Sequence, residues 1–330
     1  MEYPRRALIV ERCLAAALLA AALATAGVES RSTFAVSARA GRPWLAWIAA
    51  RERGAASAPF LHLAIYEPSR RRLAVVHVPG DLKLEGRRTL ERAYFDAFQE
   101  TGDAGAAARA AEDLAEARLR ELSPEPIPAI SARLAVEIAP TSPEDEPALE
   151  TARELKARGR RFRTWPALAR RAAAGAPSGD GAAADALFFA LDLRRAPEEN
   201  AVPARLPVDD SAAELLGRLL AAENLPSDGR ATTVEVLNGA GEAGLASRAA
   251  KVLRSRGVDV LATGGVPPRA RTLVYDRVGN FARAAGARAA LGCPSARTIT
   301  RLDASRAVDA SVELGADCAG SFSAGGVRQP

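Results

Sequence analysis

The clearest chemical pattern in the sequence is a set of three glycines, Gly239, Gly241 and Gly244, which form a G-x-G-x-x-G motif. The motif lies between a strand-like run and a helix-like run, as it does in dinucleotide-binding proteins. There the first glycine makes a tight turn, the second lets a pyrophosphate approach the backbone, and the third lets helix pack on strand. Asp259 follows after about 20 residues, the distance of a ribose-binding carboxylate. The pattern therefore raises the hypothesis of an NAD-dependent oxidoreductase.

The amino terminus predicts where the protein works. Arg5, Arg6 and Arg12 precede an uncharged run over residues 13–28 that contains an Ala-Thr-Ala sequence near its end. A basic start, an apolar run and a small-x-small end are typical of a secretory signal peptide. The run could also be a membrane anchor, although a span usually needs about 20 residues, or a buried Ala-rich helix. We expect residues 1–28 to be a signal peptide or membrane anchor, either of which exports the rest of the chain.

Three features argue against a dinucleotide. The unit that holds the glycines has only about 90 residues, whereas a dinucleotide crosses two halves of a larger sheet. Asp259 begins its strand instead of ending it, and an exported protein would meet little nicotinamide cofactor. The alternative is a strand-to-helix turn formed by Asn238, Gly239, Gly241 and Gly244, because Asn-Gly is a strong turn pair. The amides of that turn could hold an anion or a polar ligand group at the helix start.

The cysteines and histidines predict a disulfide and no metal site. Cys293 and Cys318 could form one bridge in an oxidising compartment, closing a loop of about 25 residues and stabilising the fold by roughly 3 kcal/mol. The alternative is two small buried thiols. His62 and His77 are distant in the sequence and, with two cysteines, do not make a metal-ligand set.

The composition indicates a globular two-domain protein without a nucleic-acid partner. The chain has 330 residues, of which 48% are hydrophobic and only 5% aromatic, so we expect Ala-rich helices packed closely on sheets. The net charge of +5 is small, and the basic residues are scattered along helix faces instead of gathering with aromatic residues.

The first predicted domain spans residues 59–223 and follows a linker over residues 29–58 that contains Trp44 and Trp47. The runs FLHLAIYEP and LAVVHVPG predict an antiparallel strand pair around a basic turn. The later elements are expected as helices at 88–99 and 106–122, a strand at 132–140, two basic helices after residue 147, a strand at 185–193, and a helix at 209–223 capped by Asp209 or Asp210.

The second predicted domain spans residues 232–318, between a linker at 224–231 and a disordered tail at 319–330. Its strands are expected at 232–237, 258–263, 272–276, 297–301 and 309–314, and its helices at 242–256 and 278–291. Strands that alternate with helices predict an α/β fold, so the chain as a whole is expected to hold two α/β domains behind an apolar amino-terminal helix.

The second domain resembles the LytR C-terminal domain, a small α/β module found at the end of many cell-envelope proteins. The resemblance covers residues 231–318 and rests on separated motifs that occur in the family's order. These are the opening turn, a strand with tyrosine and an L-G-x-D ending, carried by Val236, Asn238, Gly239, Gly241, Gly244, Leu245, Ala246, Tyr275 and Leu314-Gly315-Ala316-Asp317. The resemblance implies a location in the cell envelope more than a reaction.

The first domain is similar in layout to a LytR-CpsA-Psr catalytic domain, over the stretch LHLAIYEPSRRRLAVVHVPGDLKLEGRRTLERAYFDAF. That family transfers glycopolymers from a polyprenyl pyrophosphate carrier to peptidoglycan, with arginines that hold the pyrophosphate and an aspartate near the metal. The family's P-R-D is Pro79-Gly80-Asp81 here, so the arginine is lost. A later R-x-R and D-x-x-R cluster has no counterpart, because the basic residues Arg158, Arg160, Arg161 and Arg163 lack the aspartate and the spacing.

These observations lead to two hypotheses of different kinds. The first is an exported, cell-envelope protein that is not an enzyme and needs no cofactor, and that binds or scaffolds cell-wall glycopolymer or envelope proteins through its second domain. It would be anchored in the membrane by the amino-terminal helix or secreted to the periplasm. The alternative is a divergent glycopolymer transferase that uses Mg²⁺, Asp81, Arg87 and Arg88. Whether the protein is an enzyme therefore stays open, and the sequence favours a non-catalytic protein.

Overall fold

The computed structural model describes residues 32–322, apart from 56, 85, 87, 124–125, 142–145, 161–181, 198–199, 210 and 222–229. The predicted signal peptide or membrane anchor at 1–28 lies outside the described residues, as does most of the predicted tail. Within the described part of the chain, no helix is both long and apolar enough to cross a bilayer.

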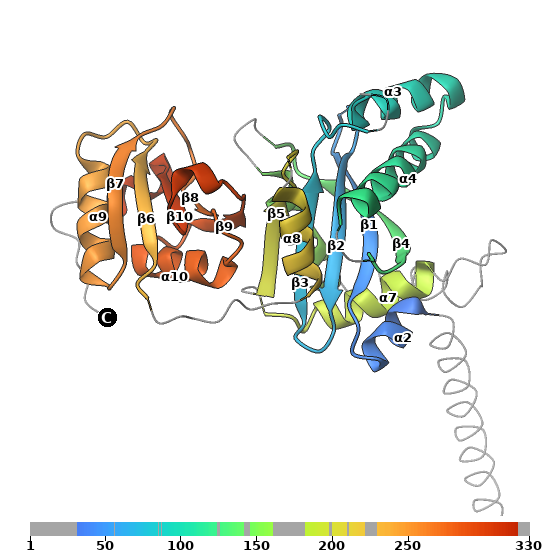
Figure 1. Cartoon of the computed structure of the whole chain (residues 1–330), viewed down its shortest axis with the longest axis horizontal. Coiled ribbons are helices and arrows are strands. Elements are labelled where there is room, and N and C mark those ends of the chain that lie inside the picture. Colours follow the sequence, from blue (N-terminus) through green and yellow to red (C-terminus); the bar gives the residue numbers. More distant parts are fainter. Residues whose placement is uncertain are drawn as a thin grey trace, which may run out of the picture.

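The described strands form one mixed sheet with the order β4-β1-β2-β3-β5-β9-β8-β10-β6-β7, which is covered by helices, so the fold is α/β (Figure 1). Two halves of this sheet meet at β5 and β9, which are joined by a single residue pair, Ala204 and Thr300. The first half holds β1 (Trp44–Glu52), β2 (Phe60–Glu67), β3 (Arg72–Val78), β4 (Ile130–Ile138) and β5 (Ala201–Arg205). The second half holds β6 (Thr233–Asn238), β7 (Asp259–Gly265), β8 (Leu273–Asp276), β9 (Arg297–Thr300) and β10 (Ala310–Leu314).

Helices cover both faces of the first half. One face carries α3 (Leu90–Thr101), α4 (Ala104–Leu122) and α8 (Ser211–Leu220), whose apolar residues share a core with Leu63 and Val76. The other face carries α2 (Thr33–Arg39), α5 (Pro147–Arg160) and α7 (Ala182–Leu193), which pack with Trp44 and Tyr66. The predicted antiparallel pair of β2 and β3 is confirmed, as are the helices near 88–99 and 106–122 and the strand near 132–140.

The expected linker at 29–58 is wrong for most of its length. It contains α2 and β1, and β1 lies inside the sheet between β4 and β2. Trp44 is 1% exposed and Trp47 is 0% exposed, because each packs under helices on an opposite face of the sheet. A strand buried on both faces shows no alternation of apolar and polar residues, so its sequence resembled an irregular segment.

The strand expected at 185–193 is also wrong, since this run lies in helix α7. The positions of its two acidic residues show why the run forms a helix. Asp185 is fully buried and accepts hydrogen bonds from the Ser32 hydroxyl at 2.7 Å and the Phe34 amide at 2.9 Å, while Asp192 accepts one from the Tyr66 hydroxyl at 2.9 Å. The two aspartates are seven residues apart, which is two helical turns, so the helical period was present in the polar positions of the run.

The elements of the second half occur in the predicted order. Helices α9 (Leu245–Ser255) and α10 (Phe281–Leu291) pack on the same face of the sheet, over a separate core that includes Val236, Val274 and Val312. The 3-10 helix η5 (Ala316–Phe322) follows β10 and buries Phe322 against this core. The chain is therefore ordered past residue 319, where the disordered tail was expected to begin, because Phe322 has an apolar site to fill.

Candidate functional site

The glycine motif forms a closed strand-to-helix turn. Asn238 ends β6, and its side chain spans the turn because Nδ2 donates to the Glu242 carbonyl at 2.7 Å and Oδ1 accepts from the Ala240 amide at 3.1 Å. Gly241 and Gly244 have φ of +73° and +72°, in the left-handed region that favours glycine. Gly244 is the N-cap of α9 and offers no side chain to the helix amides.

Gly239 is required by close backbone packing. Its amide donates to the Leu314 carbonyl at 2.8 Å, and its carbonyl accepts from the Arg269 amide at 2.6 Å. A Cβ atom at this position would lie 3.0 Å from the Leu314 carbonyl oxygen and 3.2 Å from that of Pro267. The segment after β7 therefore crosses directly beside the turn, and the first glycine of the motif serves packing between backbones.

Asp259 lies at the opposite end of the sheet from the turn. It begins β7 and pairs with Thr233, whereas Asn238 pairs with Gly265 at the other end of the same two parallel strands. At about 3.3 Å per residue, the two ends are on the order of 16 Å apart. The predicted position of Asp259 is confirmed, and from there its carboxylate cannot contact a ribose at the glycine turn.

Cys293 and Cys318 are joined in a disulfide, with Cα atoms 5.9 Å apart. Both residues are buried, and the bridge ties the segment after α10 to η5. The Ser295 hydroxyl lies 3.1 Å from the sulfur of Cys293. The bridge closes the carboxyl-terminal end of the second half over its own core.

The Pro79-Gly80-Asp81 segment forms a turn at the end of β3. The Leu82 amide donates to the Pro79 carbonyl at 3.1 Å, and Asp81 is exposed at the turn. A Cβ atom at Gly80 would lie 3.2 Å from Cβ and 3.6 Å from Oε2 of Glu91, at the start of α3. At the position where the resemblance implies an arginine, this chain has a glycine that lies against a carboxylate.

Arg88, the other described residue of that hypothesis, is engaged locally. Its guanidinium pairs with the Asp96 carboxylate on α3, which also binds Arg92 at 3.0 Å. Arg87 lies outside the described residues, as do Arg161 and Arg163 and the side chains of Arg158 and Arg160. The structure therefore does not bring a set of guanidinium groups together at Asp81 among the residues it describes.

The two histidines, which are distant in the sequence, are neighbours in space. His62 and His77 face each other directly across β2 and β3, and their ring centroids are 5.2 Å apart. The register follows from the turn: Glu67 pairs with Arg72, and five residues further from the turn on each strand His62 pairs with His77. Only His62 has a side-chain contact with a hydroxyl, at 3.5 Å from Thr151, and the Nδ1 atoms of both rings are buried without a hydrogen-bond partner.

Burial sets the ionisation of this pair. Burial, followed by the charge of Arg205, lowers the pKa of His77 to about 4, against the opposing effect of Asp81. Burial and the neighbouring His77 hold the pKa of His62 well below its usual value. Both rings are therefore neutral at pH 7. In the described part of the chain, no group of three or more His, Cys, Asp or Glu side chains is arranged to hold a metal ion.

Asp309 in the second half is a buried charge whose carboxylate is hydrogen-bonded on several sides. Asp309 is 2% exposed and accepts hydrogen bonds from Arg230 at 2.7 Å, from the Thr233 amide at 2.9 Å and from Arg283 at 3.1 Å. Burial opposes its ionisation, but these donors hold its pKa below the ordinary value. Aspartate and arginine here act as parts of the fold, which sequence patterns alone did not indicate.

A comparison with protein families identifies the second half. Residues 231–317, about a quarter of the chain, match the family described as LytR cell envelope-related transcriptional attenuator. The solution structure of the C-terminal domain of RV0431 is similar at 26% sequence identity, covering 28% of this chain and 79% of that one, with a TM-score of 0.20. No curated protein gives a significant match to the sequence.

Proposed function

Because residues 231–317 form a LytR C-terminal domain, which marks a cell-envelope-related protein, we propose an exported envelope protein that binds or scaffolds cell-wall glycopolymer or envelope partners. The LytR C-terminal domain is the binding module in this proposal, and the first half supports it without catalysing a reaction. The observation that carries the proposal is the family match over residues 231–317.

Export is supported by two features of the chain. The sequence of residues 1–28 has a basic start, an apolar run and a small-x-small end, as in a secretory signal. The Cys293–Cys318 disulfide suits an oxidising compartment, where such bonds persist. The protein is either anchored by this amino-terminal segment or secreted to the periplasm.

A non-catalytic role is supported by the turn at Gly80. Transfer from a pyrophosphate carrier needs several guanidinium groups that converge on two phosphates. Here Gly80 lies against the Glu91 carboxylate, and the Arg88 guanidinium is paired with Asp96. Negative charge at these positions opposes the binding of a pyrophosphate.

Sedimentation with purified peptidoglycan tests the proposal. The exported chain, from residue 29 to 330, is incubated with peptidoglycan stripped of phosphate-containing polymers, and residues 231–318 are tested alone beside it. We expect both to sediment with the polymer, provided that circular dichroism shows the short fragment to be folded. If the exported chain stays in the supernatant, the scaffold proposal loses its support.

The alternative is a divergent glycopolymer transferase, which is favoured by the exposed carboxylate of Asp81 at a strand end. In this case Mg²⁺ would bind near Asp81, together with phosphates of the substrate. The test is turnover of a polyprenyl-pyrophosphate-linked donor with Mg²⁺, comparing the native chain with Asp81→Ala and with Asp103→Ala, an exposed aspartate that caps α4. Turnover that Asp81→Ala abolishes and Asp103→Ala preserves would replace the non-catalytic proposal.

A further inference from the structure

The seam between the two halves of the sheet is only partly closed. β5 and β9 run parallel and pair at Ala204 and Thr300 alone. Pro203 precedes this pair and has no amide hydrogen, so it cannot extend the ladder towards the start of the strands. The halves are held together around this point by Arg271, whose guanidinium lies 3.0 Å from the Glu150 carboxylate, and by Arg218, which donates to the Val278 carbonyl.

A groove of about 610 Å³ opens where the two strands separate. It is bounded by α5 and β5 from the first half and by α10 and β9 from the second. Figure 1 shows β5 and β9 on the two sides of the seam. Ala201, Pro203, Phe281 and Ala285 supply an apolar floor. The groove is therefore lined by residues that are more than 70 positions apart in the sequence, and neither half forms it alone.

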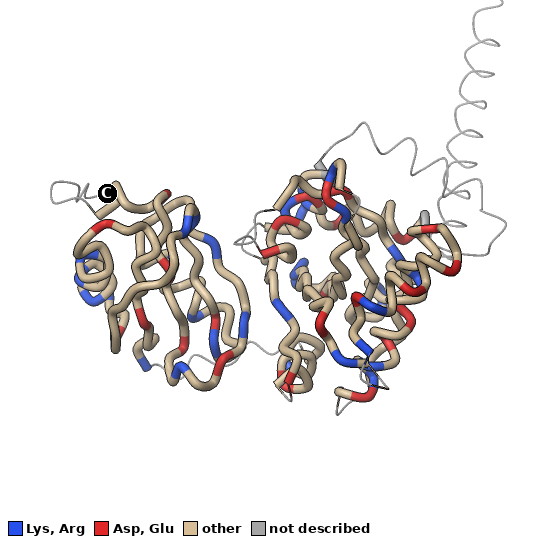
Figure 2. Tube along the Cα trace, turned by 90° about the horizontal axis from the view of Figure 1, so that it is seen from above, with Lys and Arg blue, Asp and Glu red and all other residues tan. Residues whose placement is uncertain are grey.

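The charged residues of the groove are all basic. Its lining contains Arg153, Lys156, Arg288 and Arg297 and includes no aspartate or glutamate. Lys156 is 8% exposed, and its ammonium donates to the Pro197 carbonyl, which holds it at the wall of the groove. Figure 2 shows Lys and Arg positions along the sides of the two halves that face each other. Several cations in one concave site raise the local concentration of anions.

Thr298 gives a second, independent sign of a ligand. This residue of β9 lines the groove and is 6% exposed, and its hydroxyl has no hydrogen-bond partner. A buried hydroxyl is normally satisfied, and an unsatisfied one needs a physical explanation. A ligand oxygen in the groove would accept its hydrogen bond.

We propose that this groove binds the phosphodiester groups of a cell-wall polymer. Arg288, Arg297 and Lys156 supply charge-assisted hydrogen bonds to phosphate oxygens, and the Thr298 hydroxyl donates one more. The apolar floor at Pro203 and Phe281 contacts the carbon chain or sugar between successive phosphates. The inference deepens the proposed function, on which it rests for the source of the polymer, and places the ligand at the seam between the halves.

Binding of poly(glycerol phosphate) to the full-length chain in detergent tests this inference by titration calorimetry. Inorganic phosphate and polygalacturonate, at matched charge concentration, are the comparison ligands. We expect poly(glycerol phosphate) to bind at least about 10-fold more tightly than either. Equal binding of polygalacturonate would overturn the phosphate assignment, and equal binding of inorganic phosphate would overturn the polymeric source.

Charge reversal locates the site. Arg288→Glu is expected to weaken poly(glycerol phosphate) binding by about 10-fold or more, because it replaces one phosphate-binding cation by a repelling anion. Lys251→Glu is the matched control, since it makes the same change in charge at an exposed position on α9. We expect that control to stay within about 2-fold of the native affinity. An equal loss in both variants would show nonspecific attraction and overturn the site.

Thr298→Val separates a ligand-binding role from a structural one. Removal of a buried, unpartnered hydroxyl is expected to leave the melting temperature unchanged or to raise it. The same change is expected to reduce the ligand-induced rise in melting temperature and to weaken binding by about 3-fold to 10-fold. Unchanged binding by Thr298→Val would remove the hydroxyl from the site. A chain that binds poly(glycerol phosphate) but does not sediment with phosphate-free peptidoglycan would keep this inference and reject the proposed peptidoglycan scaffold.

Discussion

The two halves of the sheet treat buried polar groups in different ways. In the first half, helices cover both faces, and the imidazoles of His62 and His77 face each other with Nδ1 atoms that have no partner. In the second half, α9 and α10 pack on one face, and Asp309 is surrounded by donors from Arg230, Thr233 and Arg283. His62 and His77 are thus kept neutral in the first half, whereas Asp309 is kept charged in the second.

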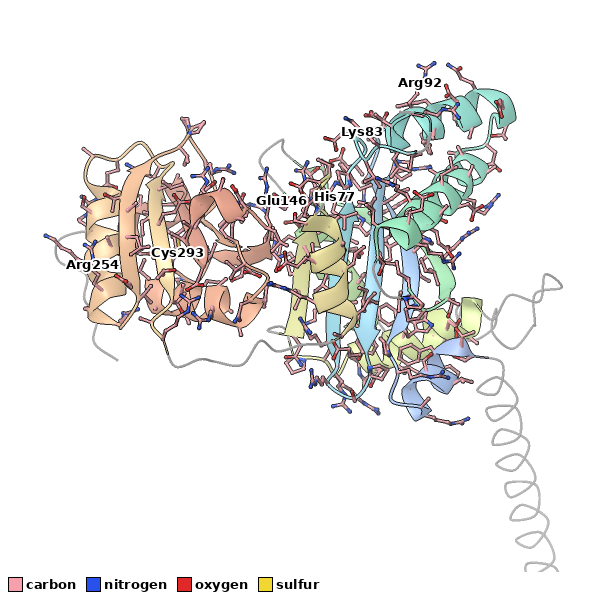
Figure 3. All side chains as sticks on the ribbon, in the orientation of Figure 1. His77, Lys83, Arg92, Glu146, Arg254 and Cys293 are labelled. Atoms are coloured by element: carbon pink, nitrogen blue, oxygen red, sulfur yellow. A yellow bond between two sulfur atoms is a disulfide. The ribbon has the colours of Figure 1, made fainter. Side chains whose placement is uncertain are left out.

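This difference affects how candidate residues are interpreted. An arginine or aspartate in the second half is more readily explained by the hydrogen bonds that it completes than by a reaction. Figure 3 shows His77 in the first half, Cys293 in the second and Glu146 near the seam between them. Glu146 is 3.9 Å from Arg301, so even charges at the seam take part in joining the halves. The groove at that seam combines several cations with an unsatisfied hydroxyl.

The largest effect is expected from breaking the charged cluster of the second half. Asp309→Ala removes a carboxylate that accepts hydrogen bonds from two arginines and from Thr233. We expect a loss of about 3–5 kcal/mol in the free energy of unfolding, because the largely buried Arg283 guanidinium loses this counter-charge and the Thr233 amide loses its acceptor. Urea unfolding at pH 7 measures the loss. Asp303→Ala, at a more exposed position paired with Arg306, is the control and should cost less than about 1 kcal/mol. Similar losses in both variants would contradict the special role of Asp309.

Loss of the Cys293–Cys318 disulfide is expected to have the next largest effect on stability. Reduction of the native chain is expected to lower its stability by about 3 kcal/mol, since the bridge restricts a loop of 25 residues in the unfolded state. The double variant Cys293→Ala with Cys318→Ala should show a similar stability with and without reductant. Thermal unfolding with and without a thiol reagent measures both. Two titratable thiols at these positions in protein purified without a reducing agent would show that the bridge does not form.

Titration should distinguish His77 in the first half from Asp276 in the second by the sign of the pH effect on the free energy of unfolding. As pH falls, the unfolded chain protonates His77 near pH 6.5, whereas the folded chain does so only near its lowered pKa of about 4. Stability is therefore lost as pH falls between these values, by about 2–3 kcal/mol. Urea unfolding from pH 7.5 to 4 should show this loss in the native chain and a smaller loss in His77→Phe. The same pH dependence of stability in both proteins would contradict the lowered pKa of His77.

Asp276 in the second half provides the opposite case. Burial raises its pKa to about 6, although hydrogen bonds from Thr300 and the Val278 and Asn280 amides oppose the shift. As pH falls, the folded state binds this proton at a higher pH than the unfolded state does. The contribution of protonated Asp276 to the stability of the fold is therefore present at low pH and is lost as pH rises through about 6. The difference between the native chain and Asp276→Asn should therefore change in the direction opposite to that for His77→Phe.

The sequence predicted the second half better than the first, for physical reasons. Alternating strands and helices with short loops produce a local pattern, and the turn at Asn238 follows from residue type. Helix α7 was missed because its apolar run conceals the seven-residue spacing of Asp185 and Asp192. β5 was missed because it is five residues long and contains Pro203. The groove could not be predicted, since it depends on the pairing of Ala204 with Thr300 across the two halves.

The smallest expected effect tests why glycine is needed at the turn of the second half. Gly239→Ala would place a methyl group 3.0 Å from the Leu314 carbonyl oxygen, so backbone atoms must move. Gly241→Ala meets nothing within 4 Å and suffers only from its φ of +73°. We expect losses of about 2 kcal/mol for Gly239→Ala and about 1 kcal/mol for Gly241→Ala, measured by urea unfolding. The reverse order would mean that backbone conformation, and not the contact between β6 and β10, sets the requirement.

A dinucleotide role of the same turn predicts a different result: NAD would stabilise the native chain against unfolding and would not stabilise Gly241→Ala, since the second glycine admits the pyrophosphate. Because the polar groups of Asn238 and Gly239 are already bonded within the protein, we expect NAD to leave the stability of both proteins unchanged.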